Sequence, residues 1–272
     1  MPTITRESLA QIIAAHLIEN KEGLRKQWLA SSPVRHFYLD GLLPQETAAR
    51  IYQSLPAPQE LMLRDSMKER KRVGIKLEDY APEMEAILFA FQDDAVLKIV
   101  SEITGREDLH ADASLYGSGI SQMMEGDFLL PHLDNSHDGD GQLYRVLNAL
   151  YYITPDWPEN EGGNLELWDK SMKQRAEVHA KFNRLVMMET HTESVHSVSK
   201  VTKPGGVRAC ISNYYFSAIP ADGKEHMHKT TFFARPEDGM GKKIALGVEG
   251  ALKASLSKLM PNNKSGTKHR RK

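Results

Sequence analysis

Residues 122–136 read QMMEGDFLLPHLDNS, and residues 143–153 read LYRVLNALYYI. Both segments are short, rich in apolar and aromatic residues, and flanked by glycine and aspartate, as strands in turn-rich sheets are. Runs of similar character follow at 164–168, 184–188, 195–201 and 208–216. Several short strands with turns between them are typical of an antiparallel sandwich or barrel. The sequence therefore predicts a mainly β core, folded as a double-stranded β-helix (a cupin-like jelly roll).

The segments outside this core show a helical pattern. Apolar residues recur at three- and four-residue steps over residues 6–30 and 82–104, a shorter helix is expected at 45–54, and a short strand at 36–39. We therefore predict an α+β protein that forms one structural domain with three parts. These are an N-terminal helical support at residues 1–110, the jelly-roll core at 111–220, and a C-terminal helical extension with a basic tail at 221–272.

The composition is that of a soluble globular protein. Hydrophobic residues make up 40% and charged residues 26% of the chain, and the formal net charge of −1 gives no general attraction to nucleic acid or membrane. The only cysteine, Cys210, excludes an intramolecular disulfide and a cysteine-based zinc site. No secretory signal and no apolar run near the ~20 residues of a membrane span is visible. We expect a cytoplasmic protein without membrane or nucleic-acid partners.

His132 and Asp134, in an H-x-D motif, and the later His196 are candidate metal ligands. Two imidazoles and one carboxylate can hold a metal ion on one face, as in non-haem Fe(II) oxygenases, and leave positions for a co-substrate and O2. His196 lies in an alternating run that is typical of a strand. An H-x-D motif alone is a weak signal, and a single histidine on a strand is more often a hydrogen-bonded structural residue. These residues alone leave both interpretations open.

Arg208 is a candidate anion-binding residue. Its planar guanidinium offers a donor fork that matches a carboxylate and stays charged when buried. The neighbours Ala209, Cys210 and Ile211 indicate burial rather than a surface position. If residues 208–216 form a strand, Arg208 and Ser212 share one face of it.

Five ordered segments resemble the prolyl 4-hydroxylase type of 2-oxoglutarate- and Fe(II)-dependent dioxygenases. The segments are residues 37–44, 122–136, 145–153 and 161–167, and His196-Ser197-Val198 with Arg208. In this order they resemble the segment before the family's first helix, its first iron-ligand segment, its next core strand, its GG-x-L turn, and its distal histidine with the co-substrate arginine. The similarity covers roughly residues 35–55 and 112–217.

This resemblance implies that His132, Asp134 and His196 bind Fe(II) and that Arg208 pairs with the distal carboxylate of 2-oxoglutarate. It implies a dioxygenase that uses O2 to hydroxylate an unactivated C–H bond while 2-oxoglutarate is decarboxylated to succinate and CO2. Ascorbate is expected to stimulate such an enzyme. In related halogenases the carboxylate ligand is absent, so Asp134 favours hydroxylation over halogenation.

Two positions depart from the family's pattern. Cys210 stands where many members carry a serine, and a thiol is a much weaker donor. Met124 stands where many members place a tyrosine that helps to hold the co-substrate. We therefore expect another side chain to make the second contact with 2-oxoglutarate, and the candidates are Ser212, Asn148 and Tyr116.

A basic stretch at residues 64–76 precedes the predicted core. It is interpreted as a lid that closes over an anionic substrate, such as an amino acid or another small metabolite. Arg70 and Arg72 in this stretch, and Asn135 and His137 beside the H-x-D motif, are the candidate substrate contacts. A solvated surface segment is an equally good interpretation of the basic stretch.

Other functions remain open. One is a peptidyl-prolyl hydroxylase that acts on a protein. A more distant one is a non-redox, cupin-like metal-binding isomerase or sensor, against which Arg208 argues. The weakest is a catalytically silent nucleic-acid-binding protein that uses residues 64–76 and the basic tail, since the net charge is near zero. His226 and His228 form an H-x-H pair that is better suited to contact substrate than to hold a second metal.

Overall fold

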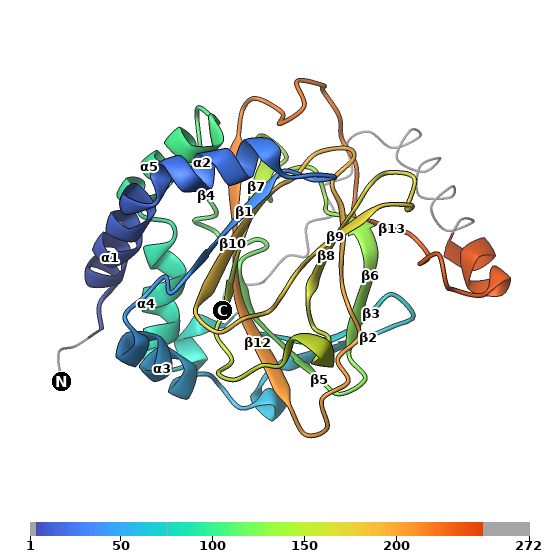
Figure 1. Ribbon diagram of the computed structural model, residues 1–272, viewed down its shortest axis with the longest axis horizontal. Coiled ribbons are helices and arrows are strands. Elements are labelled where there is room, and N and C mark those ends of the chain that lie inside the picture. Colours follow the sequence, from blue (N-terminus) through green and yellow to red (C-terminus); the bar gives the residue numbers. More distant parts are fainter. Residues whose placement is uncertain (1–3, 75, 247–272) are drawn as a thin grey trace.

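The computed structural model describes residues 4–74 and 76–246 of the chain. Its centre is a strongly curved antiparallel sheet, with helices along the outside of one side (Figure 1). The sheet order is β1-β10-β7-β12-β5-β3-β6-β11-β8-β9, while β2 pairs with β3, β4 with β12 and β13 with β6. Neighbours in this order are mostly distant in sequence, which is the crossed connectivity of a double-stranded β-helix. The predicted jelly roll is confirmed.

The strands fall into two groups by their place in this sheet. Those that build the centre are β5 (Gly119–Met124), β6 (Phe128–Leu133), β7 (Tyr144–Tyr152), β8 (Leu165–Trp168), β10 (Arg184–Glu189), β11 (Val195–Val198) and β12 (Val207–Ser217). Those that extend it are β1 (His36–Asp40), β2 (Met62–Asp65), β3 (Glu69–Gly74), β4 (His110–Ala111), β9 (Arg175–Val178) and β13 (Thr231–Phe232).

The helices are more divided than the apolar pattern indicated. They are α1 (Arg6–Glu19), α2 (Lys21–Ala30), α3 (Gln45–Gln53), α4 (Pro82–Ala90) and α5 (Asp94–Thr104), with short 3-10 turns at Pro58–Glu60, Leu77–Asp79 and Glu159–Glu161. The single helices expected at 6–30 and 82–104 are therefore wrong. Asn20 ends α1 with a non-helical backbone, and the Asp93 carboxylate accepts a hydrogen bond from the backbone N–H of Ala95 and starts a new helix.

Two apolar clusters lie on opposite faces of the sheet. Alternation along β7 places Tyr151 in the cluster beneath the helices and Tyr152 in the cluster inside the barrel. The inner cluster also contains Met123, Leu129 and Cys210 from three other strands. These residues define the inner face, on which a ligand between the two halves of the barrel would lie.

The basic stretch forms a β-hairpin rather than an irregular lid. Strands β2 and β3 pair in the register Arg64↔Lys71 and Asp65↔Arg70, and β3 continues onto β5 and β6. In the C-terminal extension, residues 240–246 are helical as predicted, and the basic tail lies outside the described residues. None of the helices in the described ranges has the length and apolar character needed to cross a membrane.

The turn before β10 contains a residue on which two segments depend. Asn183 has φ of 58°, and its side chain donates to the Leu43 carbonyl (2.7 Å) and accepts from the Leu43 N–H (3.0 Å) and the Tyr151 hydroxyl (2.8 Å). It therefore joins the turn after β1 to the centre of the sheet.

Replacing Asn183 by Ala should lower the free energy of unfolding by about 3 kcal/mol, because buried polar groups lose their partners and alanine resists positive φ. Urea denaturation followed by circular dichroism measures the change. Asn183→Gly is the matched control, since it removes the same hydrogen bonds but accepts the backbone angle, and it should be the milder of the two. A loss below 1 kcal/mol for Asn183→Ala would contradict this role.

Candidate active site

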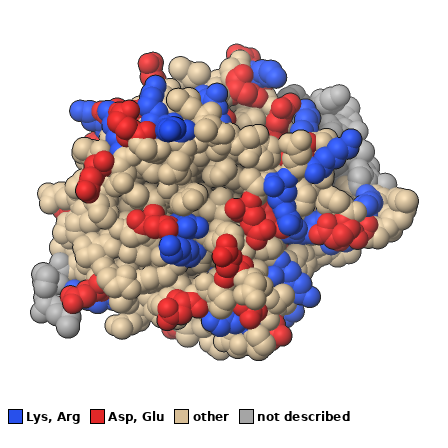
Figure 2. All heavy atoms as spheres, in the orientation of Figure 1, with Lys and Arg blue, Asp and Glu red and all other residues tan. Residues whose placement is uncertain are grey.

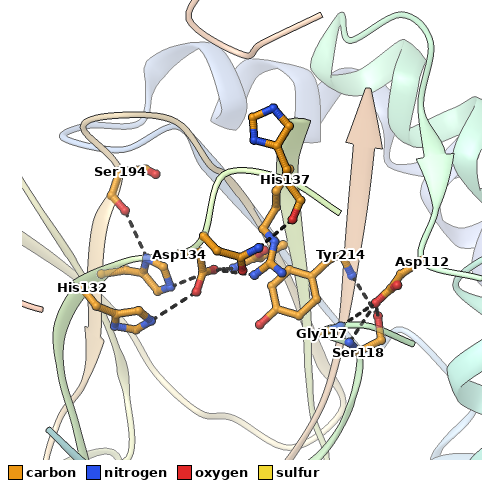
Figure 3. A network of polar contacts seen from close by, with 12 residues as sticks. Asp112, Gly117, Ser118, His132, Asp134, His137, Ser194 and Tyr214 are labelled. Carbon is orange, nitrogen blue, oxygen red and sulfur yellow. Dashed lines mark hydrogen bonds and ion pairs between the residues drawn. The ribbon is translucent and has the colours of Figure 1, made fainter. Parts of the chain in front are cut away.

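The register of two strands brings the three predicted ligands together. His132 on β6 lies directly opposite His196 on β11, and Asp134 follows β6 by one residue. The Nε2 atoms of His132 and His196 lie 3.5 and 3.6 Å from the Asp134 carboxylate oxygens, and the imidazole centroids are 4.2 Å apart. One ligand atom from each residue falls within 4.8 Å of the others. Figure 3 shows the Asp134 carboxylate turned towards His132.

The backbone fixes the orientation of both imidazoles. Nδ1 of His132 lies 2.9 Å from the Leu130 carbonyl, and Nδ1 of His196 lies 3.1 Å from the Ser194 carbonyl. A ring that donates from Nδ1 keeps its lone pair on Nε2, which here faces the carboxylate. Burial, with the His132 ring close by, lowers the pKa of His196 to about 4, so His196 is neutral and ready to bind a cation.

Asp134 is held as a carboxylate by two neighbours that the sequence did not single out as its partners. Arg145 Nη1 lies 3.4 Å from Oδ2, and the Asn148 amide donates to the same oxygen at 2.9 Å. Burial raises the pKa of Asp134, but Arg145 and the nearby imidazoles outweigh it and hold the pKa well below the usual range. Arg145 is itself buried and stacks on the Tyr214 ring at 3.9 Å.

This donor set fits Fe(II). Two neutral imidazoles and one carboxylate suit a divalent first-row metal, and among the described residues no further histidine, cysteine or acid joins the cluster. An ion held by these three groups alone keeps coordination positions for a chelating co-substrate and for O2. A closed structural site would instead require a fourth protein ligand.

A second polar centre lies on the same inner face, around Arg208 of β12. Arg208 is 3% exposed, donates from Nε to the Gly163 carbonyl (2.9 Å) and lies over the Tyr152 ring at 4.6 Å. Its Nη1 lies 4.0 Å from the Met123 sulfur, and no carboxylate in the part of the chain that the structure describes forms an ion pair with it. The Tyr152 hydroxyl is also buried without a hydrogen-bond partner there. A buried guanidinium beside an unpaired phenol is suited to an anionic ligand, since an unpaired buried charge is costly.

The predicted glycine turn explains how the chain passes Arg208 so closely. Gly162 and Gly163 both have positive φ, of 69° and 73°. A Cβ on Gly162 would lie 1.9 Å from the Lys200 carbonyl oxygen, and one on Gly163 would lie 3.1 Å from Arg208 Cγ. Only glycine fits both the space and the backbone angle at Gly162.

The structure places the predicted second contacts to the co-substrate at different sites. Asn148 lies beside Asp134, the Ser212 hydroxyl donates to the Gly119 carbonyl (3.2 Å), and Tyr116 is 41% exposed in the loop before β5. Burial raises the pKa of the Cys210 thiol to about 11, so it is a neutral, weak donor.

Tyr152 is a further polar residue of the inner face that the sequence patterns did not single out. It lies directly opposite Cys210 in the β7–β12 register, and Cys210 is two residues after Arg208 on β12. The signal was present in the sequence: Asn148 and Tyr152 are four residues apart on one strand and must share a face.

The predicted substrate contacts form two groups. Arg70 Nε and Arg72 Nη1 lie 3.4 and 3.0 Å from the carboxylate of the buried Asp127. The Asn135 amide donates to the His137 carbonyl (2.6 Å), and the His137 ring packs on Tyr144 at 4.4 Å, in the loop after Asp134. A role of these four residues in substrate binding stays a prediction.

The H-x-H pair lies close to this loop. The His226 and His228 rings stack at 5.3 Å, and His226 lies 5.2 Å from the Tyr144 ring. In the described ranges these histidines do not form a cluster of three metal-ligating groups, so no second metal site is indicated.

Comparisons with known proteins agree with this geometry. Residues 118–216 match the family model described as the 2OG-Fe(II) oxygenase superfamily. No curated protein sequence matches the chain. The solved structures with a similar fold include prolyl hydroxylases and the protein HygX.

A prolyl hydroxylase from Trichoplax adhaerens, in complex with a hypoxia inducible factor peptide, is 16% identical, with a TM-score of 0.52 over 81% of this chain and 94% of its own. A Pseudomonas putida prolyl-4-hydroxylase is 17% identical (TM-score 0.51, 75% and 98%). Streptomyces hygroscopicus HygX, with nickel, 2-oxoglutarate and hygromycin B bound, is 15% identical (TM-score 0.51, 75% and 96%). At these identities the likeness establishes the shared fold.

The matched segment contains the His-Asp-His cluster and Arg208, so the chain is similar to the 2OG-Fe(II) oxygenase superfamily over residues 118–216. It is an Fe(II)- and 2-oxoglutarate-dependent oxygenase with a prolyl 4-hydroxylase-like fold. The predictions of family, reaction class and cofactors are confirmed.

Acid should destabilise the metal-free protein partly through His196. The folded ring stays neutral down to about pH 4, whereas in the unfolded chain it takes up a proton near its ordinary pKa of about 6.5. The unfolded state thus binds more protons, and stability falls as the pH falls between these values. The free energies of unfolding of wild type and His196→Gln are compared by denaturation with a chelator present. Between pH 7 and pH 4.5 the stability of wild type should fall more than that of the variant. A constant difference would refute this account.

Proposed function

We propose that this enzyme hydroxylates an unactivated C–H bond with an Fe(II) ion held by His132, Asp134 and His196. Arg208 and Tyr152 would bind the distal carboxylate of 2-oxoglutarate, whose other end reaches the metal. The observation that carries the proposal is the Arg208 guanidinium. It is buried, has no acidic partner among the described residues, and lies on the same inner face as the metal cluster. A dianionic co-substrate supplies the missing charge.

The protein's own residues have distinct tasks in this scheme. When bound, iron and 2-oxoglutarate supply the oxidising chemistry, with succinate and CO2 as by-products. Arg145 and Asn148 keep Asp134 ionised and oriented, and the backbone carbonyls at Leu130 and Ser194 set the tautomer of each imidazole. The apolar inner cluster limits the access of water to the reacting atoms.

For the acceptor we propose an amino acid or another small, charged metabolite. The β2–β3 hairpin borders the inner face and carries charged side chains towards it, as Arg64, Glu69 and Lys71 share one face. Nucleic acid is disfavoured, because acidic and basic side chains are interspersed on the face shown in Figure 2.

A prolyl residue of a protein is the second candidate acceptor. Strand β2 pairs only with β3 in the described sheet, so its outer edge is free to bind an extended peptide. Met62 and Leu63 on this strand are 51% and 47% exposed. The prolyl hydroxylases of similar fold, one of them in complex with a peptide, add support.

Alanine at His132, Asp134 or His196 should abolish succinate formation from 2-oxoglutarate and weaken the binding of Mn(II), used as a probe for Fe(II). Arg208→Met should leave Mn(II) binding intact but raise the KM for 2-oxoglutarate by about 100-fold, because a charge-assisted pair of about 3 kcal/mol is lost. Calorimetry and succinate release measure the two effects. Unchanged Mn(II) binding in the alanine variants, or an unchanged KM in Arg208→Met, would refute the respective assignment.

The two acceptor classes separate in one experiment. Full-length protein with Fe(II), ascorbate and O2 is mixed with free amino acids, other small anions, or proline-containing peptides, and succinate release is compared with the rate without acceptor. We expect stimulation by a free amino acid or small anion, with a gain of one oxygen by mass spectrometry. Stimulation by the peptides alone would favour the prolyl alternative.

A further inference from the structure

The inner face of strand β3 carries two charged residues that neither the metal cluster nor Arg208 accounts for. Lys71 Nζ lies 3.0 Å from the Glu69 carboxylate, and the two side chains are 18% and 19% exposed. Arg64, opposite Lys71 on β2, lies 4.0 Å from Glu69. This ion pair is therefore mostly enclosed, at the place where the hairpin joins the barrel.

The strand registers fix the direction of these side chains. Val73, Ser121, Cys210 and Tyr152 form one continuous row across β3, β5, β12 and β7. Cys210 and Tyr152 belong to the inner cluster, and residues opposite one another share a face. Val73 is thus on the inner face, and so is Lys71, two residues earlier.

The next row of the same sheet connects Lys71 to the proposed co-substrate site. Met123 is two residues after Ser121 on β5, and Arg208 is two residues before Cys210 on β12. Met123 and Arg208 lie opposite each other in the β5–β12 register. Lys71, Met123 and Arg208 therefore occupy one row over three neighbouring strands. Strands are about 4.8 Å apart, which separates the Lys71 and Arg208 backbones by roughly 10 Å and lets both side chains reach a ligand above Met123.

Glu69 lies on the same face, opposite Leu129 of the inner cluster. Arg70 alternates to the outer face, where it pairs with Asp127. The electrostatics of the inner face agree with this arrangement. Burial raises the pKa of the Cys210 thiol, and the positive charges of Arg208 and Lys71 offset part of this rise. Arg208 and Lys71 are thus two cations of the inner face, on the two strands that flank β5, and Glu69 forms an ion pair with Lys71.

We propose that Lys71 is a second cationic contact for the distal carboxylate of 2-oxoglutarate and that Glu69 competes with this carboxylate for the lysine. This inference rests on the proposed function. Two carboxylate oxygens can each accept a charge-assisted hydrogen bond, one from Arg208 and one from Lys71. Lys71 would compensate for Cys210 and Met124, which supply no strong donor at the positions where many relatives have one.

The test is the affinity of the full-length, Mn(II)-loaded protein for 2-oxoglutarate, measured by calorimetry without O2. Lys71→Met should weaken binding by about 10- to 100-fold, and Lys71→Arg should stay within about 3-fold of wild type. Glu69→Gln should tighten binding by about 2- to 10-fold, because a competing negative charge is removed. Lys173→Met, which makes the same change at an exposed lysine in the turn between β8 and β9, is the matched control and should stay within about 2-fold.

A second ligand separates direct contact from a general loss of structure. 2-Oxopentanoate keeps the chelating end of 2-oxoglutarate but lacks its distal carboxylate, so Lys71→Met should bind it as wild type does. Equal weakening for both ligands, or changes of the same sign in Lys71→Met and Glu69→Gln, would overturn the assignment. If wild type itself does not bind 2-oxoglutarate, the proposed function fails instead, which distinguishes the two failures.

Discussion

The pairing of β6 with β11 is the constraint on which the site depends, because it places His132 opposite His196. A slip of one residue would turn His196 to the other face of the sheet. A buried network opposes such a slip. The Ser197 hydroxyl donates to the Glu166 carboxylate (2.6 Å) and accepts from the Trp168 indole N–H (2.7 Å), and Arg235 pairs with Glu166 at 2.6 Å. The residue next to the candidate ligand is thus fixed to β8, which sets the register of β11.

The inner face of the barrel retains polar groups that the fold alone does not satisfy. The Tyr152 hydroxyl, the Asn148 carbonyl and Arg145 Nε are buried without hydrogen-bond partners within the described part of the chain. Each such group lowers the stability of the folded state by roughly 1–3 kcal/mol. They cluster around the candidate metal ligands and Arg208, where the binding of ions and co-substrate offers compensation. Other unpartnered groups, such as the Trp28 indole N–H, lie elsewhere in the described part of the chain, so compensation by ligands at the site applies to the three groups above.

Much of the fold and the centre of the site could be predicted from the sequence, because both rest on local patterns. The strand segments, the H-x-D motif and the GG turn each consist of a few consecutive residues, so each can be recognised within one short stretch of sequence. The helix breaks at Asn20 and Asp93 were missed because apolar spacing continues across them, while the backbone turns at a polar cap. The roles of Arg145 and Tyr152 were missed for another reason. They depend on which strands become neighbours, and that information is not contained in any one segment.

The basic hairpin shows how alternation divides one charged segment between two tasks. On the outer face, Arg70 and Arg72 pair with Asp127, whose carboxylate also accepts from the Met124 N–H (2.9 Å) in the turn between β5 and β6. These contacts tie the hairpin to the barrel and hold β3 in register. Because β3 is held there, its alternate residues must face inward, and Lys71 is directed to the row that contains Arg208. The sequence-based prediction named Arg70 and Arg72 as substrate contacts and did not single out Lys71. The geometry distinguishes them. The guanidinium groups of Arg70 and Arg72 are paired with the buried Asp127 carboxylate and have little charge left for a ligand. The Lys71 ammonium is paired with Glu69 on the inner face, where a ligand carboxylate can compete for it.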